Sequence, residues 1–161
     1  MTYSIKQISR ALGLSRARID QWISRGVFDH PNRPALGLAR DWEFRDVARV
    51  ALTAEIAESK VSVSIAASFS RVAADNEFPD CFFVVFQNKS IPTGLTAHDE
   101  RDIEAGLVQI DRYWWTCELV QRERLTQFLS RPEISSAVVV DLGNLMRRLQ
   151  ASLTSIDSGA Q

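Results

Sequence analysis

Long cationic and amide side chains recur at helical spacing near the start of the chain. Arginine donates two hydrogen bonds to guanine, glutamine pairs in the same way with adenine, and both also reach phosphate oxygens. A helix that presents such donors in a major groove has the chemistry to read a DNA sequence. The side chains concerned, with the serine that precedes them, are Ser15, Arg16, Arg18, Gln21 and Arg25. They predict a nucleic-acid interface.

Two short helices joined by a tight turn are predicted to position these side chains. Ser4 followed by Gln7 is a capping box, which satisfies the free amides at the start of a helix. Gly13 supplies the positive φ of a sharp turn, and Ser15 can cap the next helix. Apolar residues at helical spacing give each helix an inner face: Ile5, Ile8 and Leu12 in the first, Leu14 at the corner, and Ile19, Trp22 and Ile23 in the second. The pattern predicts a helix-turn-helix.

A segment rich in proline and glycine follows, over residues 31–41. Two prolines and a glycine within it disfavour a helix and predict a hairpin-like excursion, with residues 38–42 as its returning strand. Arg33 and Arg40 lie on this excursion. A basic hairpin beside a recognition helix is a wing, which follows the phosphate backbone or enters the minor groove.

Composition indicates a soluble globular protein. The 161 residues are 45% apolar and 24% charged, which is enough apolar content for a real core. No apolar run approaches the roughly 20 residues that a membrane helix needs. Cys81 and Cys117 are too far apart for a CxxC motif and too few for a zinc site. We therefore expect a reduced, cytoplasmic setting, in association with the nucleoid.

The net charge of −1 conceals an asymmetry along the chain. Residues 1–40 hold seven Lys/Arg against two acidic residues, a balance of +5, while the remainder holds 12 basic against 18 acidic residues, a balance of −6. A local positive patch favours phosphate through counterion release and electrostatic steering. A solvated charged face is the alternative interpretation of the same residues.

Residues with catalytic or metal-binding chemistry do not form a recognisable motif. His30 and His98 lie in loop-like polar stretches without a Ser, Cys or carboxylate at motif spacing. The acidic residues at 99–104 suit the start of a helix better than a metal. No phosphate-binding glycine motif occurs. We expect no enzymatic activity, no cofactor and no metal.

Further helices are predicted after the wing. One starts near Phe44, and its apolar stripe should pack on the first two helices; Ser62 can cap the next. A polar break at 75–80 marks the predicted domain boundary. The stripe consists of Val47, Val50, Ala51, Ala54 and Ala57.

Beyond the break, the pattern predicts an α+β unit. Strands are expected at 81–86, 113–119 and 136–140, helices at 122–130 and 142–153, and a disordered tail at 156–161. One alternative stays open. Apolar residues between 99 and 129 also fall near a seven-residue repeat, which a single long helix would explain.

The order of motifs in residues 2–70 resembles the MerR-type winged helix-turn-helix family. The matching positions are the Gly13-Leu14-Ser15 turn, Gln21-Trp22, Arg25-Gly26, Arg40-Asp41-Trp42, Phe44 and Asp46-Val47. The resemblance implies sequence-directed binding of double-stranded DNA as a dimer, in bacterial or phage gene control. Residues 75–161 depart from the family because they do not continue into one long dimerisation helix. Excisionases and small terminase subunits of phages use the same module.

The sequence therefore predicts a mainly α fold with a small β component. A winged helix-turn-helix at 1–75 precedes an α+β module at 80–155 that serves dimerisation or contact with a protein partner. We expect a transcriptional regulator with a recognition helix at 16–25 and a basic wing at 31–41. The alternative is a phage assembly or architectural DNA-binding protein. The predicted DNA-binding residues are Ser15, Arg16, Arg18, Gln21, Arg25, Arg33 and Arg40.

Overall fold

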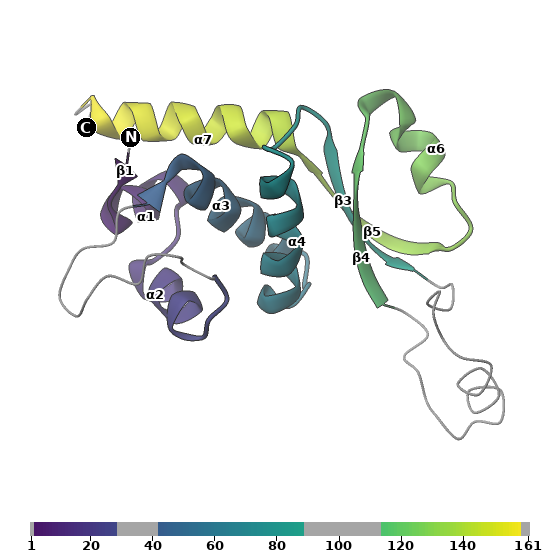
Figure 1. The fold of residues 1–161 in the computed structure, drawn as a ribbon, viewed down its shortest axis with the longest axis horizontal. Coiled ribbons are helices and arrows are strands. Elements are labelled where there is room, and N and C mark those ends of the chain that lie inside the picture. Colours follow the sequence, from purple (N-terminus) through teal and green to yellow (C-terminus); the bar gives the residue numbers. More distant parts are fainter. Residues whose placement is uncertain (1, 29–41, 89–113, 159–161) are drawn as a thin grey trace, which may run out of the picture.

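Helices and two small antiparallel sheets make up the described part of the chain, which is residues 2–28, 42–88 and 114–158 of a computed structural model. In chain order the elements are β1 (Thr2–Tyr3), α1 (Ile5–Leu12), α2 (Arg16–Ser24), β2 (Trp42–Glu43), α3 (Phe44–Glu58), α4 (Val63–Asp75), β3 (Phe82–Asn88), β4 (Trp114–Val120), the 3-10 turn η1 (Arg122–Arg124), α6 (Leu125–Leu129), β5 (Ile134–Asp141) and α7 (Leu142–Asp157). Helices α1–α4 gather at one end, β3–β5 with α6 lie at the other, and α7 runs back along the helices (Figure 1). The predicted mixture of helices and a smaller β component is confirmed.

The start and stop signals of the first two helices act as predicted. The Ser4 side chain accepts a hydrogen bond from the Gln7 amide, and the Gln7 side chain accepts one from the Ser4 amide. Gly13 ends α1 in the left-handed region with a φ of 63°. Leu14 is buried at the corner, and the Ser15 side chain caps α2. The α1–turn–α2 geometry follows from contacts between residues close in sequence.

A two-stranded ribbon joins the start of the chain to the start of α3. Thr2 pairs with Glu43 and Tyr3 pairs with Trp42, and Trp42 is only 1% exposed. The sequence did not predict this pairing. Apart from Trp42, the predicted wing and its returning strand, with Arg33 and Arg40, lie outside the described residues.

Helix α3 is buried on almost every side. The sequence predicted one apolar stripe against the first two helices, but α3 packs mainly against α4 and also against α7 and β5. The hydroxyls of Thr53 and Ser70 are fully buried and lie 3.1 Å apart. Ser70 donates to the Ala67 carbonyl, and the single hydroxyl hydrogen of Thr53 has two acceptors in reach, the Ser70 hydroxyl and the Arg49 carbonyl. Buried hydroxyls paired in this way stabilise the packing and do not penalise it. Ser62 caps α4 as predicted.

The larger sheet has the order β4–β3–β5, with both pairings antiparallel. β3 is central, and its four residues 83–86 are buried in succession because helices cover both faces of the sheet. All three predicted strands are confirmed. Trp114–Val120 pairs along its whole length with β3, so a single helix through 99–129 is excluded, and α6 is a separate short helix.

One hydrophobic core extends from the helices into the sheet. Its members include Ile8 of α1, Val47 of α3, Phe83 of β3 and Leu149 of α7. This core crosses the boundary predicted at residues 75–80, because α7 leaves the sheet and packs against α1 and α3. Independent folding of residues 1–75 stays a prediction. α7 also continues to Asp157, past the start of the tail predicted as disordered at 156–161.

Candidate nucleic-acid interface

The orientation of α2 is set by the residues on its inner side. Ile19 is fully buried and Trp22 is 4% exposed, and the Trp22 ring lies 6.1 Å from that of Phe28, centroid to centroid. Turning these apolar residues inward leaves the opposite side of the helix to solvent. The exposed residues include all five that the sequence placed at the interface on this helix: Ser15, Arg16, Arg18, Gln21 and Arg25.

Arg18 stacks on an aromatic ring of its own helix. The Cζ atom of its guanidinium lies 5.0 Å from the centroid of the Trp22 ring, a cation–π arrangement. Stacking on a buried tryptophan restricts the rotamers of Arg18 while its donors stay in solvent. A planar donor held in this way loses less entropy on pairing with a base.

Arg16 is held more loosely. Its Nε atom lies 3.4 Å from Asp20 Oδ2 one turn later, and the two side chains are 71% and 52% exposed. An ion pair this exposed contributes little, so a phosphate can replace the carboxylate of Asp20. Asp20 is an anion on the cationic face, and the sequence prediction gave it no role there.

Ser15 and Arg25 occupy the two ends of α2. Ser15 Oγ accepts a hydrogen bond of 3.2 Å from the Arg18 amide, so this serine is a cap whose own hydroxyl hydrogen remains free to donate. The Arg25 amide donates to the Gln21 carbonyl, so Arg25 is the C-cap residue that closes the last turn of α2. Gln21 itself is exposed between them.

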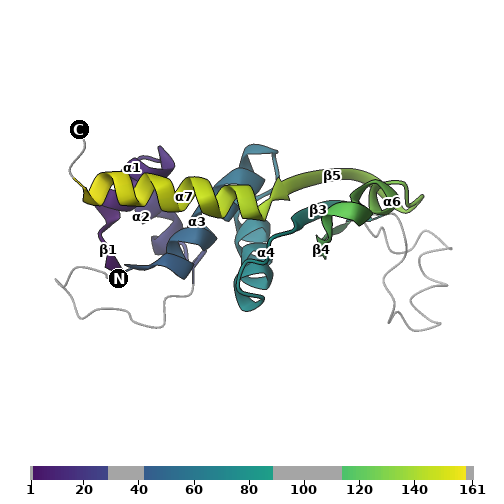
Figure 2. The same cartoon turned by 90° about the horizontal axis from the view of Figure 1, so that it is seen from above.

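Helix α2 lies on the opposite side of α1 and α3 from α7 (Figure 1). In Figure 1, α1 and α3 lie between α7, which is above them, and α2, which is below them. In Figure 2, which is seen from above, α7 lies in front of α2. Helix α7, which connects the helices to the sheet, therefore does not cover α2 (Figure 1, Figure 2).

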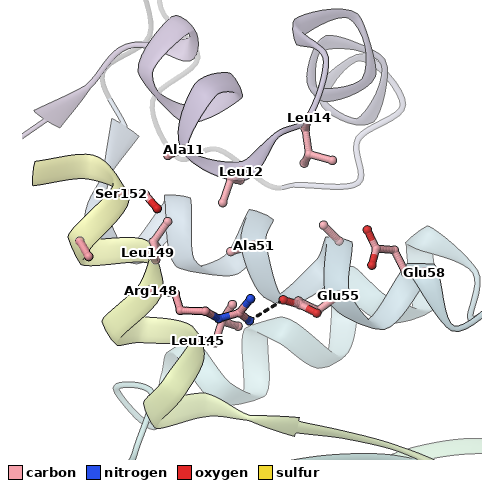
Figure 3. A pocket seen from close by; sticks show the side chains of 12 residues that line it. Ala11, Leu12, Leu14, Ala51, Glu55, Glu58, Leu145, Arg148, Leu149 and Ser152 are labelled. Carbon is pink, nitrogen blue, oxygen red and sulfur yellow. Dashed lines mark hydrogen bonds and ion pairs between the residues drawn. The ribbon is translucent and has the colours of Figure 1, made fainter. Parts of the chain in front are cut away.

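A hollow of about 430 Å³ lies where α1, α3 and α7 meet. Leu12 and Leu14 line it from the helix-turn-helix side and Leu149 lines it from α7, as Figure 3 shows. Across it, Arg148 donates a hydrogen bond of 2.7 Å to Glu55 Oε1. The hollow therefore lies between the turn that precedes α2 and helix α7.

A second charged cluster lies at one end of the sheet and joins residues next to all three strands. Asp80 precedes β3, Arg122 follows β4, and Asp141 ends β5. Arg122 lies 2.8 Å from Asp80 Oδ1 and 2.8 Å from Asp141 Oδ1. The Arg122 hydrogen bonds lower the pKa of Asp141 from 3.8 to about 2, and those to Asp141 and Asp80 raise the pKa of Arg122 above its usual value. Asp141 Oδ1 also caps α7 by accepting from the Asn144 amide. The sequence gave no signal for this cluster, since Asp80 and Asp141 are 42 and 19 residues from Arg122.

The two cysteines have the properties of structural residues. Cys81 is 1% exposed, and burial raises its thiol pKa above the ordinary value. Burial raises the pKa of Cys117 to about 11. Both thiols are therefore protonated at neutral pH, whereas reactive cysteines are thiolates.

The remaining expectations of the sequence concern absences. Within residues 2–28, 42–88 and 114–158, no group of three His, Cys, Asp or Glu side chains is arranged to hold a metal ion. In the same residues, no helix is both long and apolar enough to cross a membrane. His30, His98 and the acidic residues at 99–104 lie outside the described residues, and the absence of catalysis stays a prediction.

Of the predicted interface, five residues are exposed on α2 or at its ends, and Arg33 and Arg40 lie outside the described residues. Comparison with protein-family models found no match, and comparison with curated proteins found none either. The resemblance to the MerR-type winged helix-turn-helix therefore stays a prediction from the residues.

Proposed function

We propose that this protein is a sequence-specific DNA-binding regulator that inserts α2 into the major groove of double-stranded DNA. The observation that carries the proposal is the exposed side of α2, where three arginines and a glutamine project from a helix whose other side is fixed by Ile19 and Trp22. Residues of these types form the bidentate contacts that distinguish base pairs.

The surroundings of α2 support this use. The turn before it is short and closed by Gly13 and Leu14, so α1 supports α2 as the first helix supports the recognition helix in a helix-turn-helix. Lys6 and Arg10 of α1 are also exposed and add positive charge nearby. Basic residues around a recognition helix hold the phosphate backbone and fix the register of the protein on DNA.

A regulator of this kind works as a homodimer. One recognition module buries roughly 600–1,000 Å² on DNA, which gives weak binding at cellular salt unless a second copy binds beside it. Two copies related by a twofold axis read a palindromic site. We therefore propose that the residues beyond the helix-turn-helix hold two copies together.

The test is selection of bound genomic fragments followed by sequencing, with the wild type and with Arg18→Ala. Arg18 should contribute about 1–3 kcal/mol of discrimination between base pairs, so the variant should relax the selected sequence as well as weaken binding. Arg71→Ala on α4, an exposed arginine far from α2 in sequence, is the matched control and should select the wild-type site.

Two results would count against the proposal. Equal losses of Arg18→Ala on selected and random DNA would reduce Arg18 to a phosphate contact. A ring of many subunits bound to DNA, measured by its mass, would favour the packaging or architectural alternative over a regulator.

A further inference from the structure

Strand β5 has an open outer edge. It pairs with β3 on one side, and no strand of the described residues pairs with it on the other. Its eight residues run from Ile134 to Asp141, and the first seven include no charge, proline or glycine. An edge strand presents unpaired backbone N–H and C=O groups, and natural proteins usually protect it with lysine, proline or a bulge.

The one irregularity of β5 lies at its start. The register with β3 shifts between Gln87 and Asn88, which leaves Ser135 as an extra residue. From Ser136 to Asp141 the pairing is regular. Ser136, Ala137 and Val139 are exposed in this regular part. The part of β5 that carries the open edge is therefore free of bulges, which leaves its outer backbone groups in the regular spacing that a further strand needs.

The opposite edge of the sheet differs in its chemistry. β4 also pairs only with β3 among the described strands, but it carries Glu118 near its middle. Glu118 is exposed and lies 3.4 Å from Arg131, which follows α6. A charge in the middle of an edge strand disfavours addition of another strand. Of these two edge strands, β5 is the one without a charged side chain near its middle.

Apolar side chains are exposed on β5 and on α6, the helix that covers one face of the sheet. Val139 is 38% exposed and stands opposite Val84 of β3, so it lies on the sheet face that Phe128 of α6 partly covers. Leu129 of the same helix is 39% exposed. A second chain that pairs with β5 would cover apolar surface in addition to backbone groups.

We infer that the β5 edge pairs antiparallel with β5 of a second copy of this chain, which makes one six-stranded sheet. An uncharged strand meets no like charge when it pairs with itself, and antiparallel self-pairing about a twofold axis uses the same patch on both copies. The twofold axis is perpendicular to the sheet. Equivalent helices of the two copies therefore lie on the same face of the six-stranded sheet. This inference deepens the proposed homodimer, and it does not require DNA.

The first experiment measures the mass of the full chain by light scattering over a concentration series, without DNA. The wild type should have twice the mass of one chain. Ala137→Lys should raise the dissociation constant of the dimer at least about 10-fold, because two lysines meet near the axis. Ala151→Lys, the same change at an exposed site of α7, should leave the dimer intact. A monomeric wild type, or a dimer unaffected by Ala137→Lys, overturns the inference.

A second measurement uses the wild type alone, so it does not depend on how a variant folds. Hydrogen exchange of the amides in residues 136–141 should slow as the protein concentration rises, while that of β4 should not change. Exchange in β5 that does not depend on concentration contradicts the inference. A wild-type dimer that selects no DNA sequence would count against the proposed function and leave this inference standing.

Discussion

The helical end and the sheet end of this molecule expose opposite kinds of surface. On α2, side chains carry the exposed chemistry, since Arg16, Arg18 and Arg25 stand out from a helix whose backbone bonds are satisfied internally. On β5, the backbone carries it, since the strand is uncharged up to Val140 and lacks a partner on its outer side among the described strands. Cations select a polyanion, whereas an unpaired strand edge selects another strand. The two ends are thus suited to two different classes of partner.

A single hydrophobic core nevertheless joins these ends, and Phe83→Ala should destabilise both ends together. Phe83 is fully buried in β3 and belongs to the core that includes α1, α3 and α7. Removing its ring should lower the free energy of unfolding by about 3–5 kcal/mol. Denaturant unfolding followed by tryptophan fluorescence and by circular dichroism should shift together, with Leu129→Ala as an exposed control that changes little. Separate transitions would show that the two ends fold independently.

Acid should weaken the sheet end by a smaller amount. The pKa of Asp141 is lowered in the folded protein, so its stabilisation is fully present above its ordinary pKa of 3.8 and is lost as the pH falls toward about 2. The change should be about 1 kcal/mol, because solvent screens a group that is more than a quarter exposed. Asp141→Asn keeps a capping side chain for α7 but removes the charge. Stability measured between pH 5 and pH 2 should therefore fall less in the variant, and an identical fall would assign the acid effect to other carboxylates.

The smallest expected effect concerns the cationic end, and it separates phosphate contacts from base contacts. Arg33 lies in the predicted wing, outside the described residues, and we expect it to contact phosphate without reading bases. Arg33→Ala should reduce the slope of log affinity against log salt by about one unit, with the selected sequence unchanged. Filter-binding titrations at several salt concentrations measure this slope. A slope and an affinity that both match the wild type would remove the wing from the interface.

Local signals account for most of what the sequence predicted about the interface. These signals are local. The Ser4–Gln7 box and the Ser15 cap are hydrogen bonds over three residues, and the positive φ at Gly13 depends on the residue itself, so the nearby sequence specifies all three. The buried side of α2 follows from the spacing of Ile19 and Trp22. The exposure of the five predicted residues on α2 and at its ends follows from this spacing, and their contact with DNA stays a prediction.

Contacts between distant residues needed the tertiary structure. The periodicity of residues 99–129 fitted a helix as well as a strand, and pairing of β4 with β3 decided the matter. Nothing local indicated that β2 pairs with β1 or that Arg122 joins Asp80 to Asp141.

The sequence by itself determined where the helices of the candidate interface begin and end and which of their side chains face solvent. Only the tertiary structure decided that α7 leaves the sheet to pack on α1 and α3, and that β5 and not β4 carries the unprotected edge. The physical reason is the range of the interactions. Caps and helix faces depend on neighbours within a turn, whereas sheet order and helix docking depend on which distant apolar surfaces bury each other.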